Sequence, residues 1–291
     1  MVSPLTIHHP VVLAKRATTV DHISAGRVVL GLGAGWQVNE HASYGFDLLD
    51  PGPRVSRFAE GIEVIHRLLR EDSVTFEGRA FTLRDAPFSP KPLQQSLPLL
   101  VGTKSPRMFR LAARFAAEYN TWGNPDLAAK RLEGLQRGCA AEGRDPATIA
   151  KSVQAVVLLT RSQGELDALG EFATQPNVLA GSPEQLQDSL GRYLELGFDE
   201  FALPDFTLGP DPAARADKLA EIRVEVISPL MCLAGCVASR PHSLYPAEEP
   251  AALCAGNENQ LPSAGGWNLS WIASATASGR NDSAFSSSRV A

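Results

Sequence analysis

The sequence contains few cysteines and no excess of positive charge. Only 4 of its 291 residues are cysteine, and their spacing does not suggest a disulfide framework. The 27 lysines and arginines are outnumbered by 32 aspartates and glutamates, which gives a formal net charge of −5. No basic stripe is visible, so nucleic acid is not an expected partner.

Long hydrophobic runs are also missing. The longest, at about residues 226–238, contains a serine and a proline and is too short to cross a bilayer. The first residues, MVSPLTIHHPVVLAKR, lack the charged segment and apolar core of a signal peptide. We therefore expect a cytoplasmic protein that does not insert into membranes.

Several kinds of catalytic or metal-binding pattern are lacking. Cys232, Cys236 and Cys254 lie near His242, but they form no CxxC pair, so we predict no metal site. Cys139 falls in a helical pattern, where we expect a buried or half-buried thiol. We find no nucleophile elbow and no pair of carboxylates suited to one pocket.

The sequence does contain an alternation of strand and helix patterns. Strands are predicted at residues 28–33, 98–102, 118–122, 152–160 and 200–203, with residues 1–4 as the end of a sixth. Helices are predicted at residues 9–24, 54–70, 106–117, 126–142, 182–196 and 212–226, with a hairpin at 74–83. The alternation indicates βαβ units and a parallel sheet. It suits an open doubly wound sheet or most of an eight-stranded barrel.

The periodic pattern ends near residue 231. Residues 231–291 are rich in serine, alanine, glycine and asparagine and show no helical or strand period. We therefore predict one domain over residues 1–230, followed by a disordered tail over residues 231–291.

The glycine-rich stretch GLGAG, residues 31–35, begins in the predicted strand at 28–33 and continues past its end. A dinucleotide-binding turn is one interpretation, although the spacing is GxGxG and no acidic residue ends a second strand about 20 residues later. Close packing of a buried strand is another. The third is a barrel strand that ends beneath a planar cofactor, where small residues admit the ring and Asn39 hydrogen-bonds it.

A second candidate site is VGTKSPR, residues 101–107, where a strand leads through a polar loop into a helix. The N–H groups and the positive dipole end of the helix attract anions, and Lys104, Ser105 and Arg107 add donors and charge. We interpret this stretch as a phosphate-binding loop. An ordinary strand–helix connection with solvated basic residues is the alternative.

The histidines have different predicted roles. His9 precedes Pro10 and helps to start a helix, whereas His8 is placed to point into a site at a strand end. Both are otherwise ordinary loop residues. His41 and His66, like His242, are expected at the surface.

Taken together, residues 9–45, 98–123 and 181–206 resemble the luciferase-like monooxygenases, in the order found in that family. The resemblance covers about residues 1–230. The most similar branch uses the deazaflavin coenzyme F420, and FMN-dependent monooxygenases are close relatives. The resemblance implies a (β/α)8 TIM barrel that binds its cofactor at the carboxyl ends of the strands.

The resemblance also implies which residues bind the cofactor. Ser3, Ala34, Gly35 and Asn39 fall where the family lines the ring, at the ends of its third and fourth strands.

The stretch Thr103–Met108 matches the phosphate-binding loop of the family, with Lys104, Ser105, Arg107 and Met108 as the residues assigned to the cofactor. Lys104 and Ser105 replace a usual pair of glycines. The Lys104 side chain either strengthens phosphate binding or fills the space that the phosphate needs.

Two departures from the family matter. Two βα units and nearly all of a third strand precede the position of Met1 in the family, so we expect a barrel that lacks about its first two units. Trp36 stands where related sugar-phosphate dehydrogenases carry a glutamate, so that activity is not assigned. His8 and Trp36 are the candidates for the substrate side of the ring, and no catalytic residue is assigned.

Two functions follow as hypotheses. The first is an oxidoreductase that uses F420 for hydride transfer, or reduced FMN for oxygen activation, on a small organic substrate. The second is a non-catalytic barrel remnant that binds no cofactor or only a partner chain. An incomplete barrel exposes two sheet edges, which a homodimer would cover; a fragment of a longer protein, or an unstable and inactive chain, is the alternative.

Overall fold

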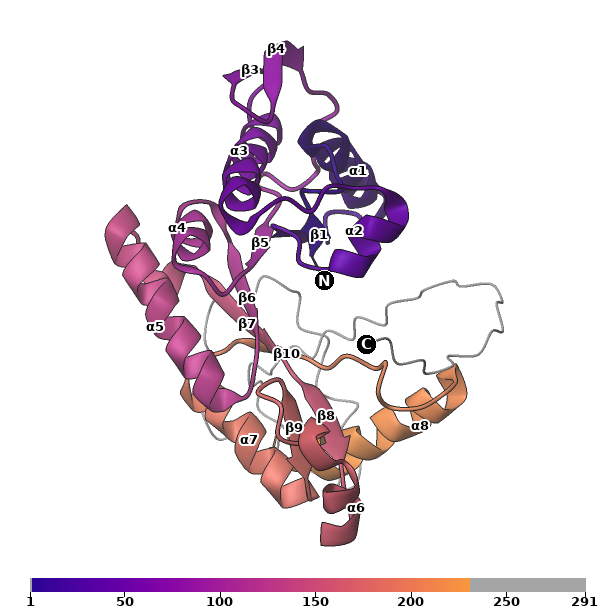
Figure 1. The fold of residues 1–291 in the computed structure, drawn as a ribbon. Coiled ribbons are helices and arrows are strands. Elements are labelled where there is room, and N and C mark those ends of the chain that lie inside the picture. The colour runs from indigo at the N-terminus through magenta and orange to yellow at the C-terminus, as the bar shows by residue number, and fades with distance from the viewer. Residues whose placement is uncertain (1, 231–291) are drawn as a thin grey trace, which may run out of the picture.

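The computed structural model describes residues 2–230 and confirms the expected α/β architecture with a parallel sheet (Figure 1). Six parallel strands form the main sheet in the order β1-β2-β5-β6-β7-β10. Their bounds are β1 (Ser3–Pro4), β2 (Leu30–Gly33), β5 (Leu99–Gly102), β6 (Glu118–Trp122), β7 (Ala150–Gln154) and β10 (Glu200–Ala202).

Helices alternate with these strands along the chain, as parallel connections require. They are α1 (Pro10–Ile23), α2 (Val38–Tyr44), α3 (Pro51–Leu68), α4 (Pro106–Phe115), α5 (Pro125–Glu142), α6 (Gln163–Ala168), α7 (Pro183–Glu195) and α8 (Pro212–Ile222). Figure 1 shows α4, α5 and α7 along one side of the sheet. The expected hairpin, β3 (Ser73–Glu77) and β4 (Thr82–Pro87), projects beyond α1 and α3 at one end of the molecule.

Local sequence signals explain how several helices begin. Ser182 and Gln185 form a capping box at α7, because the Ser182 hydroxyl accepts from the Gln185 N–H and the Gln185 side chain accepts from the Ser182 N–H. Pro183 follows at the first helical position, where its missing N–H costs nothing. The sequence predicted this helix start correctly.

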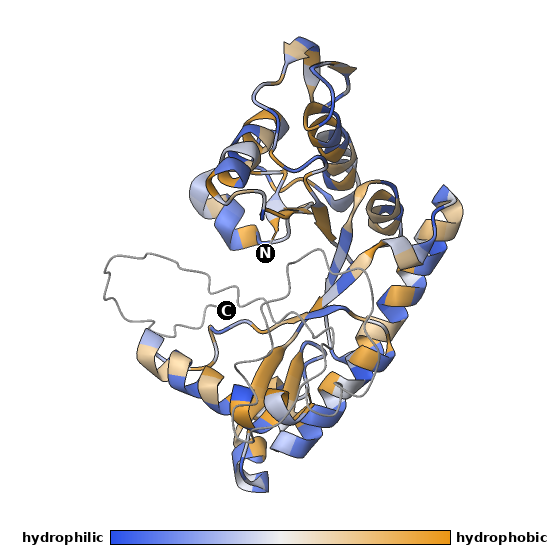
Figure 2. Cartoon of the chain, turned by 180° about the vertical axis from the view of Figure 1, so that it is seen from behind, coloured by the Kyte–Doolittle hydropathy of each residue, from blue (hydrophilic) through white to orange (hydrophobic). Residues whose placement is uncertain are grey.

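The predicted strand at 152–160 is wrong in one respect, because the structure divides it into two. β7 ends at Gln154 in the main sheet, and β8 (Val156–Leu159) pairs instead with β9 (Val178–Gly181), a strand that the sequence analysis missed. Apart from Gln154, residues 153–159 are all apolar, so the pattern gives no clear sign that the strand changes partner. Figure 2 shows β8 and β9 as a hydrophobic pair.

The helices after the glycine stretch also differ from the prediction. A short helix that was not predicted, α2, begins at Val38. The next helix, α3, begins at Pro51 instead of residue 54. α2 is only seven residues long and exposes most of its side chains. It therefore lacks the repeating apolar face by which a helix is recognised in sequence.

Several expectations concern the core, the membrane and the C-terminal residues. Cys139 is buried, as expected. Within residues 2–230, no helix is long and apolar enough to cross a membrane. The predicted tail at 231–291, including Cys232, Cys236, Cys254 and His242, lies outside the described residues.

Candidate functional site

The strand register brings the two sequence motifs together at one edge of the sheet. β1 pairs with β2 through Pro4 and Gly33, and β2 pairs with β5 through Leu32 and Val101. All three strands are parallel, so their carboxyl ends meet at the same edge. The turn after Gly33 therefore lies between the loop that follows β1 and the loop that follows β5.

The glycines at the strand ends accommodate a protein side chain. A Cβ on Gly33 would lie 3.0 Å from Val2 Cγ2, and a Cβ on Gly102 would lie 3.1 Å from Val2 Cγ1. Both distances are too short for comfortable packing, so these glycines make room for Val2. Close packing is therefore part of the reason for glycine here, as the second sequence interpretation held.

Gly35 meets a different constraint, because its backbone has a φ of +87°. A Cβ at this position would lie 2.6 Å from the hydroxyl oxygen of Thr6. Behind Gly35, the Thr6 hydroxyl lies 2.7 Å from Nε2 of His41. Glycine is thus required both by the left-handed backbone and by the approach of the Thr6 side chain.

His41 does not lie at the surface, and that expectation was wrong. Its side chain is only 2% exposed, and Nδ1 lies 2.7 Å from the carbonyl oxygen of Gln37. α2 turns this residue inward beneath the glycine turn. His66 also differs from its predicted surface position, because it is half-buried on α3 against the ring of Phe115.

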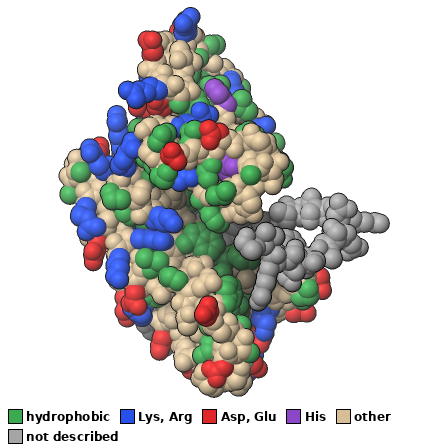
Figure 3. Space-filling view, in the orientation of Figure 1, with side chains coloured by type: hydrophobic (Ala, Val, Ile, Leu, Met, Phe, Trp, Pro, Cys, Tyr) green, Lys and Arg blue, Asp and Glu red, His purple; other side chains and the backbone are tan. Residues whose placement is uncertain are grey.

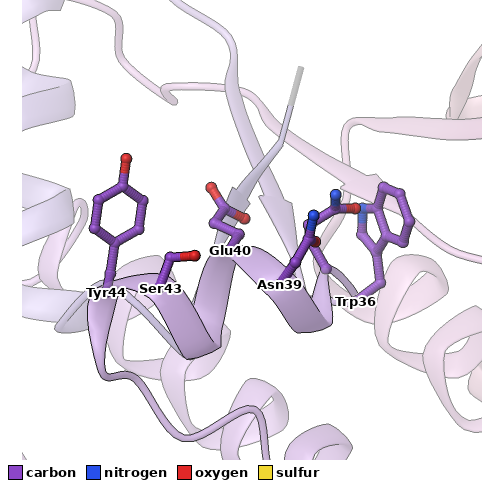
Figure 4. Close-up of a pocket in the computed structure, with 6 residues that line it drawn as sticks. Trp36, Asn39, Glu40, Ser43 and Tyr44 are labelled. Atoms are coloured by element: carbon purple, nitrogen blue, oxygen red, sulfur yellow. The ribbon is translucent and has the colours of Figure 1, made fainter. Parts of the chain in front are cut away.

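The other residues assigned to the cofactor ring and to the substrate surround this turn. Ser3 and Ala34 are half-buried, whereas Asn39 is exposed and Trp36 keeps 77% of its surface exposed. An open concavity of about 570 Å³ is lined by Trp36, Gln37, Asn39, Glu40, Ser43 and Tyr44. Figure 4 shows the labelled side chains rising from one side of α2 and the turn before it. Trp36 and Asn39 therefore share one surface.

His8 lies in the loop after β1 and is half-buried. Burial lowers the pKa of its imidazole, the charge of Arg16 lowers it further, and the carboxylate of Glu40 raises it. Because the net shift is downward from 6.5, the ring is neutral at pH 7. A neutral imidazole is able to accept a proton or a hydrogen bond.

The loop after β5 presents polar groups at the start of α4. The Ser105 N–H donates to the Thr103 hydroxyl at 3.3 Å, and Ser105, the N-cap residue, makes no side-chain capping bond. Lys104 is exposed and has no ion pair with any residue in 2–230. First-turn N–H groups and a nearby ammonium are a suitable donor set for a phosphate.

Arg107 and Met108, which the resemblance assigned to the same loop, have side chains directed elsewhere. The Arg107 guanidinium donates to the Gly52 carbonyl at 3.3 Å and to the Ser56 hydroxyl at 3.1 Å, both at the start of α3. The Met108 side chain is buried in the core. Any contact of Met108 with a phosphate would thus be made by its backbone N–H.

Positive charge gathers on the side of the molecule formed by α4 and α5, as Figure 3 shows. The exposed basic residues of these helices are Arg107, Arg110, Arg114, Lys130 and Arg137. Arg110 is paired with Glu142 at 2.8 Å, and Arg137 with Glu133 at 3.7 Å. This face is locally basic, although the chain is acidic as a whole.

The sequence analysis missed a chain of buried polar groups on β6 and β7. Gln154 donates to the side-chain oxygen of Asn120 at 2.7 Å, Asn120 donates to Ser152 at 2.8 Å, and Ser152 donates to Glu118. All four side chains are buried. Polar residues at every second position, Glu118 and Asn120 on one strand and Ser152 and Gln154 on the next, are the signal that would have found them.

Comparisons with known proteins agree with this architecture. A sequence model described as luciferase-like monooxygenase matches residues 1–169. The chain is 33% identical over 147 residues to an F420-dependent glucose-6-phosphate dehydrogenase of Microbacterium testaceum, covering 50% of this chain and 43% of that protein. It is 37% identical over 134 residues to 4-hydroxyprotoasukamycin monooxygenase of Streptomyces nodosus subsp. asukaensis, covering 45% and 35%.

The fold is also that of a solved structure. An F420-dependent secondary alcohol dehydrogenase, solved with an F420–acetone adduct, superposes with a TM-score of 0.64 at 20% identity, covering 77% of this chain and 78% of that one. At this identity the likeness concerns the fold. The chain spans less than two thirds of the length of the curated relatives it matches.

Proposed function

This chain belongs to the luciferase-like monooxygenase family, and we propose that it is an oxidoreductase that binds coenzyme F420, with FMN as the alternative. Its substrate in this proposal is a small organic molecule. Relatives of both kinds, F420-dependent enzymes and monooxygenases, support this class of activity.

One observation carries the proposal. The pairing of Leu32 with Val101 sets the glycine turn beside the polar loop at the start of α4. A ring and a phosphate that belong to one cofactor require such neighbouring sites. Every parallel sheet brings its strand ends to one edge, so the support comes from which loops are neighbours there: the glycine turn and the loop with the first-turn N–H groups of α4.

The chemistry of the residues fits a phosphate-bearing cofactor. Thr103 offers a hydroxyl, Lys104 an ammonium group and α4 its first-turn N–H groups. Ala34 has a small side chain and Gly35 has none, so both leave space at the proposed ring position, with Ser3 on the neighbouring strand. When bound, F420 supplies hydride transfer and reduced FMN supplies oxygen activation.

The chain itself would orient the substrate and handle a proton. Trp36 offers an apolar plane, and Asn39 offers an amide that donates and accepts hydrogen bonds. The neutral imidazole of His8 is suited to accept a proton from a substrate hydroxyl. We assign His8 and Trp36 to the substrate side of the ring and Asn39 to the ring itself.

Titration of the 291-residue chain with F420 and with FMN tests the proposal. Ring fluorescence reports binding, and the thermal melt reports stability. Ligand at about 100 times its dissociation constant is expected to add roughly 2.7 kcal/mol. Binding of neither cofactor would refute the proposal and favour the non-catalytic remnant.

We also propose that the chain forms a homodimer. β1 and β10 are the two end strands of the main sheet within the described residues. End strands present N–H and C=O groups that a second chain is able to pair with. Sedimentation equilibrium would test this, and a monomer at micromolar concentration would contradict it.

A further inference from the structure

One buried hydrogen bond joins the loop after β1, which carries His8, to the segment formed by Trp36 and α2. Thr6 lies in the loop after β1, two residues before His8. His41 lies on α2, two residues after Asn39 and five after Trp36. Their side chains meet at 2.7 Å although they are 35 residues apart in sequence. Both side chains are buried.

The partner of the other ring nitrogen leaves Nε2 of His41 to pair with Thr6. Nδ1 of His41 lies 2.7 Å from the Gln37 carbonyl oxygen, which only accepts, so Nδ1 carries a hydrogen. The Thr6 hydroxyl is able to donate to an unprotonated Nε2 and to accept from a protonated one, so it pairs with Nε2 in both cases.

Few other contacts hold α2 in place. His41 is the only buried residue of this helix, and Val38, Asn39, Glu40, Ala42, Ser43 and Tyr44 are exposed. A seven-residue helix with an exposed surface has little stability of its own. The position of the concavity on α2 therefore depends on the hydrogen bond between Thr6 and His41.

Gly35 allows the pair to form. Its missing Cβ leaves room for the Thr6 hydroxyl oxygen, which would otherwise lie 2.6 Å away, and its φ of +87° turns the chain into α2. The third glycine of the motif is thus explained by a contact inside the protein.

We propose that Thr6 and His41 are positioning residues that hold His8 of the β1 loop in register with Trp36 and Asn39 of the α2 segment. The inference rests on the proposed function, because that function places Asn39 at the ring and His8 and Trp36 on its substrate side. It deepens that function by naming two residues that touch neither cofactor nor substrate.

Hydrogen–deuterium exchange of the full chain tests the pair without any ligand. Thr6→Val removes the hydroxyl and keeps the side-chain shape, whereas Thr6→Ser keeps the hydroxyl. We expect amides of residues 37–44 to exchange about five- to tenfold faster in Thr6→Val, as loss of one buried hydrogen bond predicts. Thr6→Ser and the matched control Thr19→Val on the exposed face of α1 should behave as wild type.

A double variant separates the pair from general loosening. His41→Asn retains an N–H donor near Gln37 and is too short to reach Thr6. If the pair acts as a unit, Thr6→Val adds nothing to the exchange of His41→Asn. Independent, additive effects of the two changes would overturn the inference.

The functional readout is the visible circular dichroism of bound FMN or F420, which reports the surroundings of the ring. We expect Thr6→Val to change this spectrum and to weaken cofactor binding about fivefold, with recovery in Thr6→Ser. Wild-type exchange and an unchanged spectrum in Thr6→Val would overturn the inference. If neither cofactor binds, the proposed function fails, and the exchange measurement alone still decides whether the pair holds α2.

Discussion

Asn120 on β6 donates a hydrogen bond of 2.8 Å to Ser152 on β7, and this bond ties two central strands together inside the sheet. Ser152 in turn donates to Glu118, so its hydroxyl accepts one hydrogen bond and donates another. A buried hydroxyl that both donates and accepts a hydrogen bond stabilises a fold. Without it, its buried partners would have lost their hydrogen bonds to water and gained none in the protein.

The first prediction concerns this serine. Ser152→Ala deprives Asn120 of an acceptor and Glu118 of a donor, so we expect the free energy of unfolding to fall by about 2–4 kcal/mol. Urea denaturation measures the change. Ser189→Ala, which removes only a hydroxyl bonded to its own helix at Gln185, is the matched control and should change stability by less than about 0.5 kcal/mol. Equal losses in both variants would contradict the role given to Ser152.

The second prediction compares two glycines with similar backbones. Gly35 has a φ of +87° and meets Thr6, whereas Gly45 has a φ of +70° and no atom within 4 Å of its Cβ position. Gly45→Ala should cost only the left-handed strain of about 1 kcal/mol. Gly35→Ala should cost about 2–3 kcal/mol more, because the methyl group displaces the Thr6 hydroxyl. Thermal melts of both variants would test this, and identical melting temperatures would exclude the steric explanation.

The third prediction concerns phosphate binding. Lys104→Ala should weaken FMN or F420 binding about tenfold or more, since a charge-assisted hydrogen bond is lost. The loss should shrink at high salt, which screens an exposed ammonium group. Arg107→Ala should weaken binding less, because its guanidinium is bonded to Gly52 and Ser56 on α3. Lys130→Ala on α5 is the control for general surface charge, and an effect as large as that of Lys104→Ala would argue against a specific loop.

The fourth prediction is a pH dependence of stability. Burial is the main cause that lowers the pKa of His66 to about 4 from its usual 6.5, with Arg70 and Arg114 adding repulsion. As pH falls from 6.5 towards 4, the unfolded chain binds the proton first, so stability decreases through this range. For a half-exposed ring the loss should be about 1–2 kcal/mol after solvent screening.

His66→Gln provides the comparison. Its free energy of unfolding should fall less than that of the wild type between pH 6.5 and pH 4, while the two curves run parallel above pH 7. Urea titrations at each pH measure this difference. Parallel curves through the whole acid range would show that His66 does not cause the loss.

Local signals predicted much of the fold. The capping box at Ser182 and Gln185 marked the start of α7, and short apolar runs with a turn on either side marked β2 and β5. Such features depend on a few neighbouring residues, so the sequence displays them directly. The adjacency of the glycine turn and the Lys104 loop was not among these predictions, because it depends on the pairing of β2 with β5.

Other features depended on partners that are distant in sequence. The run from Ala150 to Leu159 changes sheets after Gln154, and only the pairing with β9 shows it. His41 has polar and exposed neighbours, so nothing local marks it as buried. Its burial follows from Thr6, which approaches from another strand end.

By itself, the sequence determined the parallel α/β class, the family and the two stretches that form the candidate site, because each depends on patterns of residues that are close along the chain. Only the tertiary structure decided what the glycines accommodate, where the Arg107 guanidinium is bound and which residue anchors α2. Those outcomes depend on contacts between residues far apart in the sequence, and the spacing of residues along the chain does not show which of them come into contact.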